Sequence, residues 1–191
     1  MSWQKLFPIR YDTDTLLGID WSALVAEGYQ CLLLDIDNTL ALTGSHEADA
    51  YARQACAEMQ EAGLELLVVS NSSQGRGEEY AATLGLPVLF GAGKPWSRKL
   101  RALKAEHPSL AHSLMVGDQL FTDVWAAKYM GIEAILVRPR KADLDFWYVH
   151  LKRWLEKPLI HWMTISHGPW AGRVAEPLPL AAPAVKGQGK N

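Results

Sequence analysis

Asp35 and Asp37 are the residues that most clearly suggest chemistry, because they follow the apolar run CLLL and are separated only by Ile36. Two carboxylates about 4 Å apart repel each other by roughly 4 kcal/mol at an effective dielectric of 20. Such a pair needs a counter-ion, and an all-oxygen ligand set suits Mg²⁺. Further polar and charged residues that could take part in the same chemistry occur later in the chain: Ser70, Lys94, Asp118 and Asp123.

Together these groups favour phosphoryl chemistry. Magnesium, a lysine and hydroxyl donors around a carboxylate form a site for a phosphoryl group, and the carboxylate can itself be the nucleophile. Simpler interpretations exist for single residues. Asp35 and Asp37 could be turn residues, and Asp123 could only cap a helix. A turn at Asp35 would not explain the remaining members of the set.

The expected order of strands and helices brings the polar residues to one edge. Alternation of strands and helices predicts an α/β protein, a Rossmann-like three-layer α/β/α fold with a parallel sheet. Ligands of such sheets bind at the carboxyl ends of the strands. The expected strands cover residues 30–35, 64–70, 87–90, 113–116 and 132–137. The expected helices cover residues 21–27, 47–61, 78–84, 96–106, 122–130 and 144–156, the last capped by Asp143 and ended by Pro158.

Composition excludes several classes of protein. The 191 residues, with 49% hydrophobic and 21% charged residues, fit one soluble globular domain and a tail. A net charge of −2 gives no general affinity for nucleic acid. Two cysteines and scattered histidines favour neither a disulfide framework nor a zinc site. With no secretory signal and no apolar run of roughly 20 residues, we expect a cytoplasmic protein.

Four ordered motifs resemble those of the haloacid dehalogenase (HAD) phosphatase superfamily, and more narrowly its YqeG-type group of subclass IIIA. They are DIDNT at 35–39, the serine of VVSNS at Ser70, the lysine of GKP at Lys94, and GDQLFTD at 117–123. The likeness covers roughly residues 8–158. It departs from the group at Ser72, where a second asparagine is common, and at Lys128, in a region that often carries asparagine. These two departures concern possible substrate contacts.

The resemblance implies a role for each matching residue. Asp35 is expected to be the nucleophile, and Asp37 the general acid and base. Asp35 and Asp118 would bind Mg²⁺ through carboxylates, Asp37 through its backbone carbonyl, and Asp123 would support the metal from a second layer. The other candidates face the substrate: Ser70, Asn71, Lys94 and Thr39 for the phosphate, and Arg76 for a further contact.

The spacing between motifs leaves no room for an inserted cap domain, so we expect a capless HAD core over residues 1–166 with an open site. Residues 167–191, rich in Pro, Ala, Gly and Lys, are expected to form a disordered tail.

The tryptophan-rich segment 143–163 allows two interpretations. With Lys152, Arg153 and Lys157 it resembles a helix at a lipid interface, which would suit relatives in the group that act on phosphatidylglycerophosphate. Alternatively, Leu144, Trp147, Leu151 and Trp154 form a stripe packed on the sheet, and we favour this interpretation because an apolar stripe on a helix is usually part of the core.

Three functions follow: a phosphatidylglycerophosphate phosphatase with peripheral membrane contact, a phosphatase of a soluble sugar, nucleotide or small-acid phosphate, and a catalytically idle interaction module. The intact aspartates argue against the last.

Overall fold

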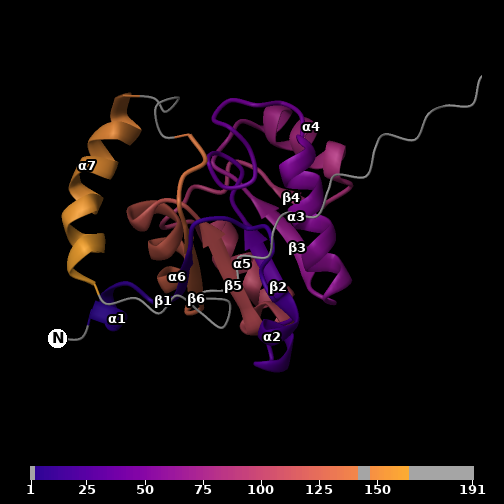
Figure 1. Ribbon diagram of the computed structural model, residues 1–191, viewed down its shortest axis with the longest axis horizontal. Coiled ribbons are helices and arrows are strands. Elements are labelled where there is room, and N and C mark those ends of the chain that lie inside the picture. Colours follow the sequence, from indigo (N-terminus) through magenta and orange to yellow (C-terminus); the bar gives the residue numbers. More distant parts are fainter. Residues whose placement is uncertain (1–2, 142–146, 164–191) are drawn as a thin grey trace, which may run out of the picture.

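A parallel sheet of six strands forms the centre of the computed structural model, which describes residues 3–141 and 147–163 (Figure 1). The strand order is β1-β6-β5-β2-β3-β4. All the pairings between neighbouring strands are parallel, as predicted. The strands are β1 (Ile9–Thr13), β2 (Cys31–Leu34), β3 (Glu65–Val69), β4 (Val88–Leu89), β5 (Ser113–Gly117) and β6 (Glu133–Val137).

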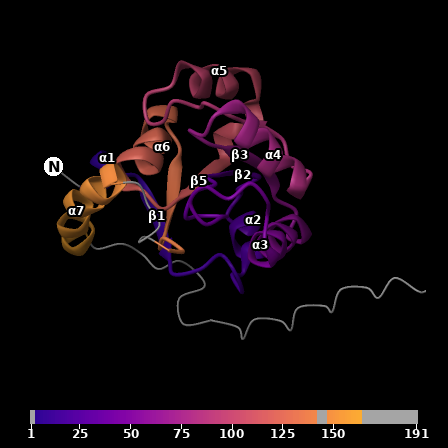
Figure 2. The same cartoon turned by 90° about the horizontal axis from the view of Figure 1, so that it is seen from above.

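Helices cover both faces of the sheet. In Figure 2, α2 and α3 lie on one side of the strands, whereas α5 and α6 lie on the other. Residues of α2, α3 and α4 share one apolar cluster, and residues of α5 and α6 share the second. The helices are α1 (Trp3–Leu6), α2 (Trp21–Ala26), α3 (Ala50–Glu61), α4 (Gln74–Leu84), α5 (Arg98–Glu106), α6 (Trp125–Met130) and α7 (Trp147–Trp162). The expected α/β fold class is therefore confirmed.

Strand β2 lies in the middle of the sheet and carries the first acid to its edge. Leu32 and Leu34 pack in one apolar cluster, and Cys31 and Leu33 pack in the other. Because both faces of the strand are covered, its apolar run is continuous rather than alternating. β5 and β3 pair with it on its two sides.

The edge strand β1 was missed by the sequence interpretation, which expected five strands. β1 pairs in parallel with β6, and Tyr11 is its one buried residue. An edge strand that is buried on one side at most needs little apolar sequence, so IRYDT gives a weak strand signal.

Several helix ends differ from the expected ones. α4 begins at Gln74, one turn earlier than predicted, in a stretch whose polar residues and glycines resembled a turn. α5 begins at Arg98, because the side chain of Ser97 accepts a hydrogen bond from the Lys99 amide and caps the helix. Pro95, directly before the expected start of that helix at residue 96, follows a cis peptide bond with Lys94.

The helix expected over 122–130 consists of two parts. A single π-helical turn, Leu120–Val124, precedes α6. This turn buries Asp123, and the Asp123 amide donates to the Gln119 carbonyl at 2.9 Å. π-Helical turns are rare and are found frequently at functional sites.

Helix α7 contradicts two predictions. It continues through Pro158 to Trp162, although Pro158 was expected to limit it. The preferred interpretation of its apolar stripe is also wrong, because Leu151 and Trp154 are 54% and 70% exposed. The residues that α7 buries include Val149, Arg153 and Glu156. Arg153 and Glu156 are buried because they bond to Asp118 and to the Phe121 amide, which lie between β5 and α6.

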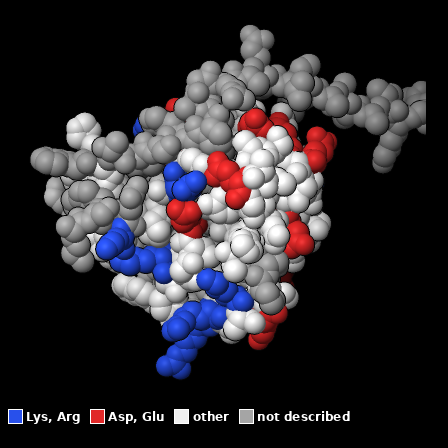
Figure 3. All heavy atoms as spheres, turned by 90° about the horizontal axis from the view of Figure 1, so that it is seen from below, with Lys and Arg blue, Asp and Glu red and all other residues white. Residues whose placement is uncertain are grey.

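The predicted Asp143 cap, Leu144 and the tail 167–191 lie outside the described residues. Among the helices that the structure describes, none is long and apolar enough to cross a membrane. Acidic and basic side chains share the face shown in Figure 3, with blue groups toward the lower left and red groups toward the right. A mixed surface of this kind agrees with a net charge close to zero.

Candidate active site

The predicted residues gather at the carboxyl edge of the sheet. Asp35 follows β2, Ser70 follows β3, Lys94 lies in the loop after β4 and Asp118 follows β5. The Asp35 amide still donates to the Val116 carbonyl at 2.9 Å, so the strand ladder extends to this residue. All four residues are buried.

The chain leaves strand geometry directly after Asp35. The Ile36 carbonyl accepts hydrogen bonds from the amides of Leu40 and Ala41, at 3.0 and 2.8 Å, which closes a tight turn. Within this turn Asn38 has a φ of 59°, a left-handed conformation that asparagine tolerates better than most residues. The turn places Asp37 beyond the strand end, where its carboxylate is partly exposed.

Lys94 joins the acids that follow two different strands. Its Nζ lies 2.5 Å from Asp35 Oδ1 and 2.7 Å from Asp123 Oδ1, and it donates to the Val69 carbonyl at 2.9 Å. Burial lowers the pKa of Lys94, but the charges of Asp123 and Asp35 outweigh it and the net pKa is raised. The lysine is therefore a permanent cation in the site.

Burial also changes the acid strength of Asp35. Removal from water raises the pKa of Asp35 to about 7, in spite of the opposing charge of Lys94. A raised carboxyl pKa in a cluster of acids is the expected result when the positive charge present is smaller than the negative charge.

Asp118 is held by a residue that the sequence interpretation did not connect with it. Arg153 of α7 donates to Asp118 Oδ2, and both side chains are buried. Burial raises the pKa of Asp118 well above its usual value, against the effect of the Arg153 charge. Its other oxygen, Oδ1, is buried without a hydrogen-bond partner among the described residues.

The sequence contained a signal that Arg153 and Glu156 act together on one face of this helix. They are charged residues three positions apart in a helix rich in aromatic residues, so they share one face of it. Glu156 is buried and accepts a hydrogen bond from the Phe121 amide at 2.9 Å. This face of α7 therefore packs on the loop that carries Asp118 and Asp123.

Asp123 is fixed through both carboxylate oxygens. Oδ1 accepts from Lys94, and Oδ2 accepts from the Gln119 amide at 3.1 Å. Gly117 is what makes room for it, since a Cβ at Gly117 would lie 2.3 Å from Asp123 Cγ. The glycine in the GDQ motif is thus explained by the close approach of a carboxylate.

A divalent metal fits this cluster. One oxygen from each of Asp35, Asp118 and Asp123 lies within 4.8 Å of the other two. Carboxylate oxygens are the ligands that Mg²⁺ prefers, and the orphaned Oδ1 of Asp118 is a buried acceptor that a cation would satisfy. Asp35 and Asp118 are suited to direct contact, whereas Asp123 has both oxygens engaged and suits a supporting position.

Asp37 lies outside the buried cluster and is paired with Arg76. Arg76 Nη1 donates to Asp37 Oδ1 at 2.9 Å, and Nη2 donates to Oδ2. Asp37 Oδ1 also accepts from the Gly44 amide at 3.0 Å. Arg76 had been predicted only as a substrate contact, and here it orients the expected acid–base residue.

The remaining phosphate candidates differ in their positions. Ser70 Oγ accepts from the Ser72 amide at 3.0 Å. Asn71 bonds to the Lys94 backbone, accepting from its amide at 2.8 Å and donating to its carbonyl at 3.2 Å, so it holds the lysine loop. Thr39 Oγ1 is buried and has no partner among the described residues. Their contact with a phosphate stays a prediction.

Comparison with known proteins agrees with this geometry. The HAD-hydrolase-like family matches residues 91–144, which include Lys94, Asp118 and Asp123. The probable phosphatase YqeG of Bacillus subtilis is 29% identical over 68% of this chain and 75% of its own length. Together with the site geometry, these matches support a HAD-like phosphatase similar to the YqeG-type group.

A second relative is the chloroplastic phosphatidylglycerophosphate phosphatase 1 of Chlamydomonas reinhardtii. It is 32% identical over 86% of this chain, and the match spans 65% of the algal protein, just under two thirds of its length. A solved structure of a hypothetical protein from Xanthomonas campestris is similar over 80% of this chain and all of its own, with a TM-score of 0.46 and 19% identity. The family and the names of the curated relatives support a phosphatase.

Proposed function

We propose that this protein is a Mg²⁺-dependent phosphomonoesterase that acts through a phosphoryl group on Asp35. The observation that carries the proposal is the buried cluster of Asp35, Asp118 and Asp123, with Lys94 bonded to the first and the last. A nucleophilic carboxylate, a fixed cation and a cation site beside them are the groups that phosphoryl transfer requires.

Lys94, Asp35 and Asp37 each have a separate role in the proposed hydrolysis. Lys94 holds Asp35 Oδ1, so the other oxygen of Asp35 is left to attack phosphorus while the P–O bond to the alcohol breaks. Asp37 gives a proton to the departing alkoxide and then removes one from the water that cleaves the acyl phosphate. That second step releases inorganic phosphate and restores the Asp35 carboxylate. Mg²⁺, when bound, neutralises charge on the phosphoryl oxygens.

The proposed substrate is phosphatidylglycerophosphate, the compound in the name of the algal relative. Support comes from the outer side of α7, where Leu151, Trp154 and Leu155 are exposed. Exposed apolar side chains on one helix suit contact with a lipid surface, where this substrate lies. We place the enzyme on the cytoplasmic side of such a membrane, as expected from the sequence.

Phosphate release from lipid vesicles tests this proposal. The parent protein with Mg²⁺ is expected to release phosphate from phosphatidylglycerophosphate and from p-nitrophenyl phosphate. Asp35→Asn and excess chelator should each reduce release to background. Glu61→Gln is the matched control, because it changes an exposed carboxylate on α3. An active Asp35→Asn enzyme, or full activity in chelator, would contradict the mechanism, and release from the soluble ester alone would contradict the lipid substrate.

A further inference from the structure

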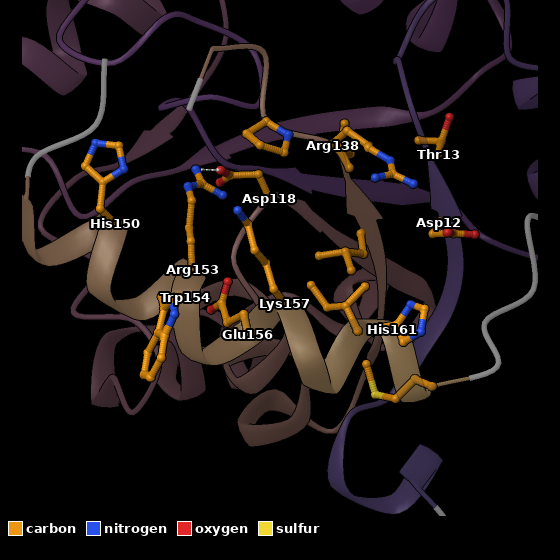
Figure 4. Close-up of a pocket in the computed structure, with 15 residues that line it drawn as sticks. Asp12, Thr13, Asp118, Arg138, His150, Arg153, Trp154, Glu156, Lys157 and His161 are labelled. Atoms are coloured by element: carbon orange, nitrogen blue, oxygen red, sulfur yellow. Dashed lines mark hydrogen bonds and ion pairs between the residues drawn. The ribbon is translucent and has the colours of Figure 1, made fainter. Parts of the chain in front are cut away.

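A cavity of about 930 Å³ lies between α7 and the carboxyl ends of β1 and β6, beside the acid cluster. Asp118 lines it, so the cavity and the candidate active site share a wall (Figure 4). None of the roles assigned above uses this space. A volume of this size suits a small-molecule group.

Three cations and three acids line the cavity, so its charge depends on which of these groups are already paired. Arg138, Arg153 and Lys157 line it. Two of its acids are already engaged, since Asp118 is bonded to Arg153 and Glu156 accepts from the Phe121 amide. The third acid, Asp12, lies on β1 on the far side of Arg138 from Asp118 (Figure 4).

Lys157 and Arg138 are the lining cations that are not bonded to Asp118. Figure 4 shows the Lys157 side chain extending from α7 toward the Asp118–Arg153 pair, with Arg138 across the cavity. Lys157 is exposed and makes no ion pair with the part of the chain that the structure describes. Arg138 Nε bonds to Asp14 at 2.7 Å, but both side chains are largely exposed, so this pair is weak.

Apolar residues form another part of the lining. Leu136 and Val137 come from β6, and Ile160 and Met163 come from the end of α7. Trp154 also lines the cavity, and its 70% exposure places it on the outer apolar side of the helix as well. The cavity therefore combines cations with an apolar surface that continues to the outside of α7.

We propose that this cavity binds a second phosphate on the leaving group of the substrate, with Lys157 and Arg138 as specificity-determining residues. The proposal rests on the proposed function and deepens it. The enzyme then prefers phosphomonoesters whose alcohol carries a phosphodiester one glycerol away from the bond that breaks. Cations are needed for the diester, and the apolar surface accepts glycerol carbons and the start of an acyl chain.

Kinetics on matched substrates test the proposal. Three are used: glycerol phosphate, which lacks the second phosphate, the deacylated headgroup glycerophosphoglycerophosphate, which has it, and a short-chain phosphatidylglycerophosphate. We expect the parent to have a lower KM for the second than for the first. Lys157→Gln and Arg138→Gln should each raise the headgroup KM about tenfold, as loss of one hydrogen bond to a charged group predicts. The rise for glycerol phosphate should be much smaller.

Lys5→Gln is the matched control, since it removes one exposed positive charge on α1, outside the cavity. Equal KM changes for headgroup and glycerol phosphate in Lys157→Gln, or no change in either, would overturn the proposal. A headgroup no better than glycerol phosphate, with only the acylated substrate preferred, would assign the preference to the lipid chains and also overturn it.

A binding measurement separates this proposal from the proposed function. Glycerophosphoglycerol carries the diester but no phosphomonoester, so its binding needs no catalysis. Calorimetry should detect it with the parent, and the affinity should fall about tenfold in Lys157→Gln. If no substrate releases phosphate but this binding and its loss are observed, the proposed function fails and the cavity assignment stands. If the parent does not bind the diester, the cavity assignment fails whatever the activity.

Discussion

Lys94 contacts residues of the other sequence motifs and so holds them together in one site. It contacts Asp35 from β2, Asp123 from the turn after β5 and the carbonyl of Val69 in β3. A buried lysine with two carboxylate partners has its three N–H donors satisfied. Removing it would leave Asp35 and Asp123 without their shared cation in a buried cluster, and this kind of loss is costly.

Asp37→Asn tests the acid–base role. Loss of proton transfer is expected to reduce kcat by about 10² to 10⁴ on an alkyl phosphate such as glycerol phosphate. The loss should be smaller on p-nitrophenyl phosphate, because nitrophenolate departs without receiving a proton. Steady-state kinetics on both esters measure the two effects. An equal loss on both substrates would indicate that Asp37 only positions Arg76, and an unchanged rate would remove the role.

Gly117→Ala tests the close contact between β5 and Asp123. The new Cβ would lie 2.3 Å from Asp123 Cγ, and Asp123 cannot move freely because Lys94 and the Gln119 amide hold it. Overpacking of this kind destabilises by about 1–3 kcal/mol, so thermal denaturation should show a Tm lower by several degrees.

Gly75→Ala is the control for that substitution. Gly75 is exposed in α4, and its Cβ would meet no atom within 4 Å. Alanine is the better helix former by up to about 1 kcal/mol, so this variant should melt at or above the temperature of the parent. A Gly117→Ala protein that melts like Gly75→Ala would contradict the packing argument.

At the scale of single elements, the sequence predicted what depends on local patterns. The continuous apolar residues of β2 and the polar residues after the strands predicted the central strand and the edge where Asp35 and Asp118 lie. The two predictions that failed on α7 depend on tertiary contacts. The face of α7 that is buried is the one carrying Arg153 and Glu156, because these residues bond to groups far away in the sequence. The spacing of apolar residues within the helix gives no information about such distant partners.

The outer side of α7 gives a prediction about membranes. Leu151 and Leu155 are 54% and 49% exposed and do not line the cavity. The double variant Leu151→Ser, Leu155→Ser should bind vesicles containing anionic lipid about tenfold more weakly, since apolar area no longer enters the interface. Cosedimentation with vesicles measures this. Val25→Ser, which changes an exposed apolar residue on α2, is the control.

The substitutions should leave folding nearly unchanged, because exposed positions usually alter stability by about 0.5 kcal/mol or less. Equal vesicle binding by the parent and the double variant, with the same melting temperature, would show that α7 does not dock on lipid. The interpretation that the stripe faces solvent or another partner would then be favoured.

At the scale of the whole molecule, the acid cluster makes the stability of the fold depend on pH and on Mg²⁺ binding. Asp35 has a pKa of about 7 in the metal-free fold, above its value in the unfolded chain. Between about pH 4 and pH 7 the folded state therefore holds a proton that the unfolded state has lost, and stability falls as the pH rises through this window. Mg²⁺ needs the carboxylates deprotonated, so its affinity should increase over the same window.

Melting curves with and without Mg²⁺ test this linkage. Without metal, the contribution of Asp35 should lower Tm as the pH rises from 5 to 7. At one fixed Mg²⁺ concentration, the increase in Tm should be larger at pH 8 than at pH 5.5, since a ligand stabilises the fold according to its affinity. Asp118→Asn removes a carboxylate ligand from the same buried cluster, and it should abolish most of the increase at both pH values. The same increase at both pH values in the parent, or one that survives in Asp118→Asn, would show that Mg²⁺ binds elsewhere.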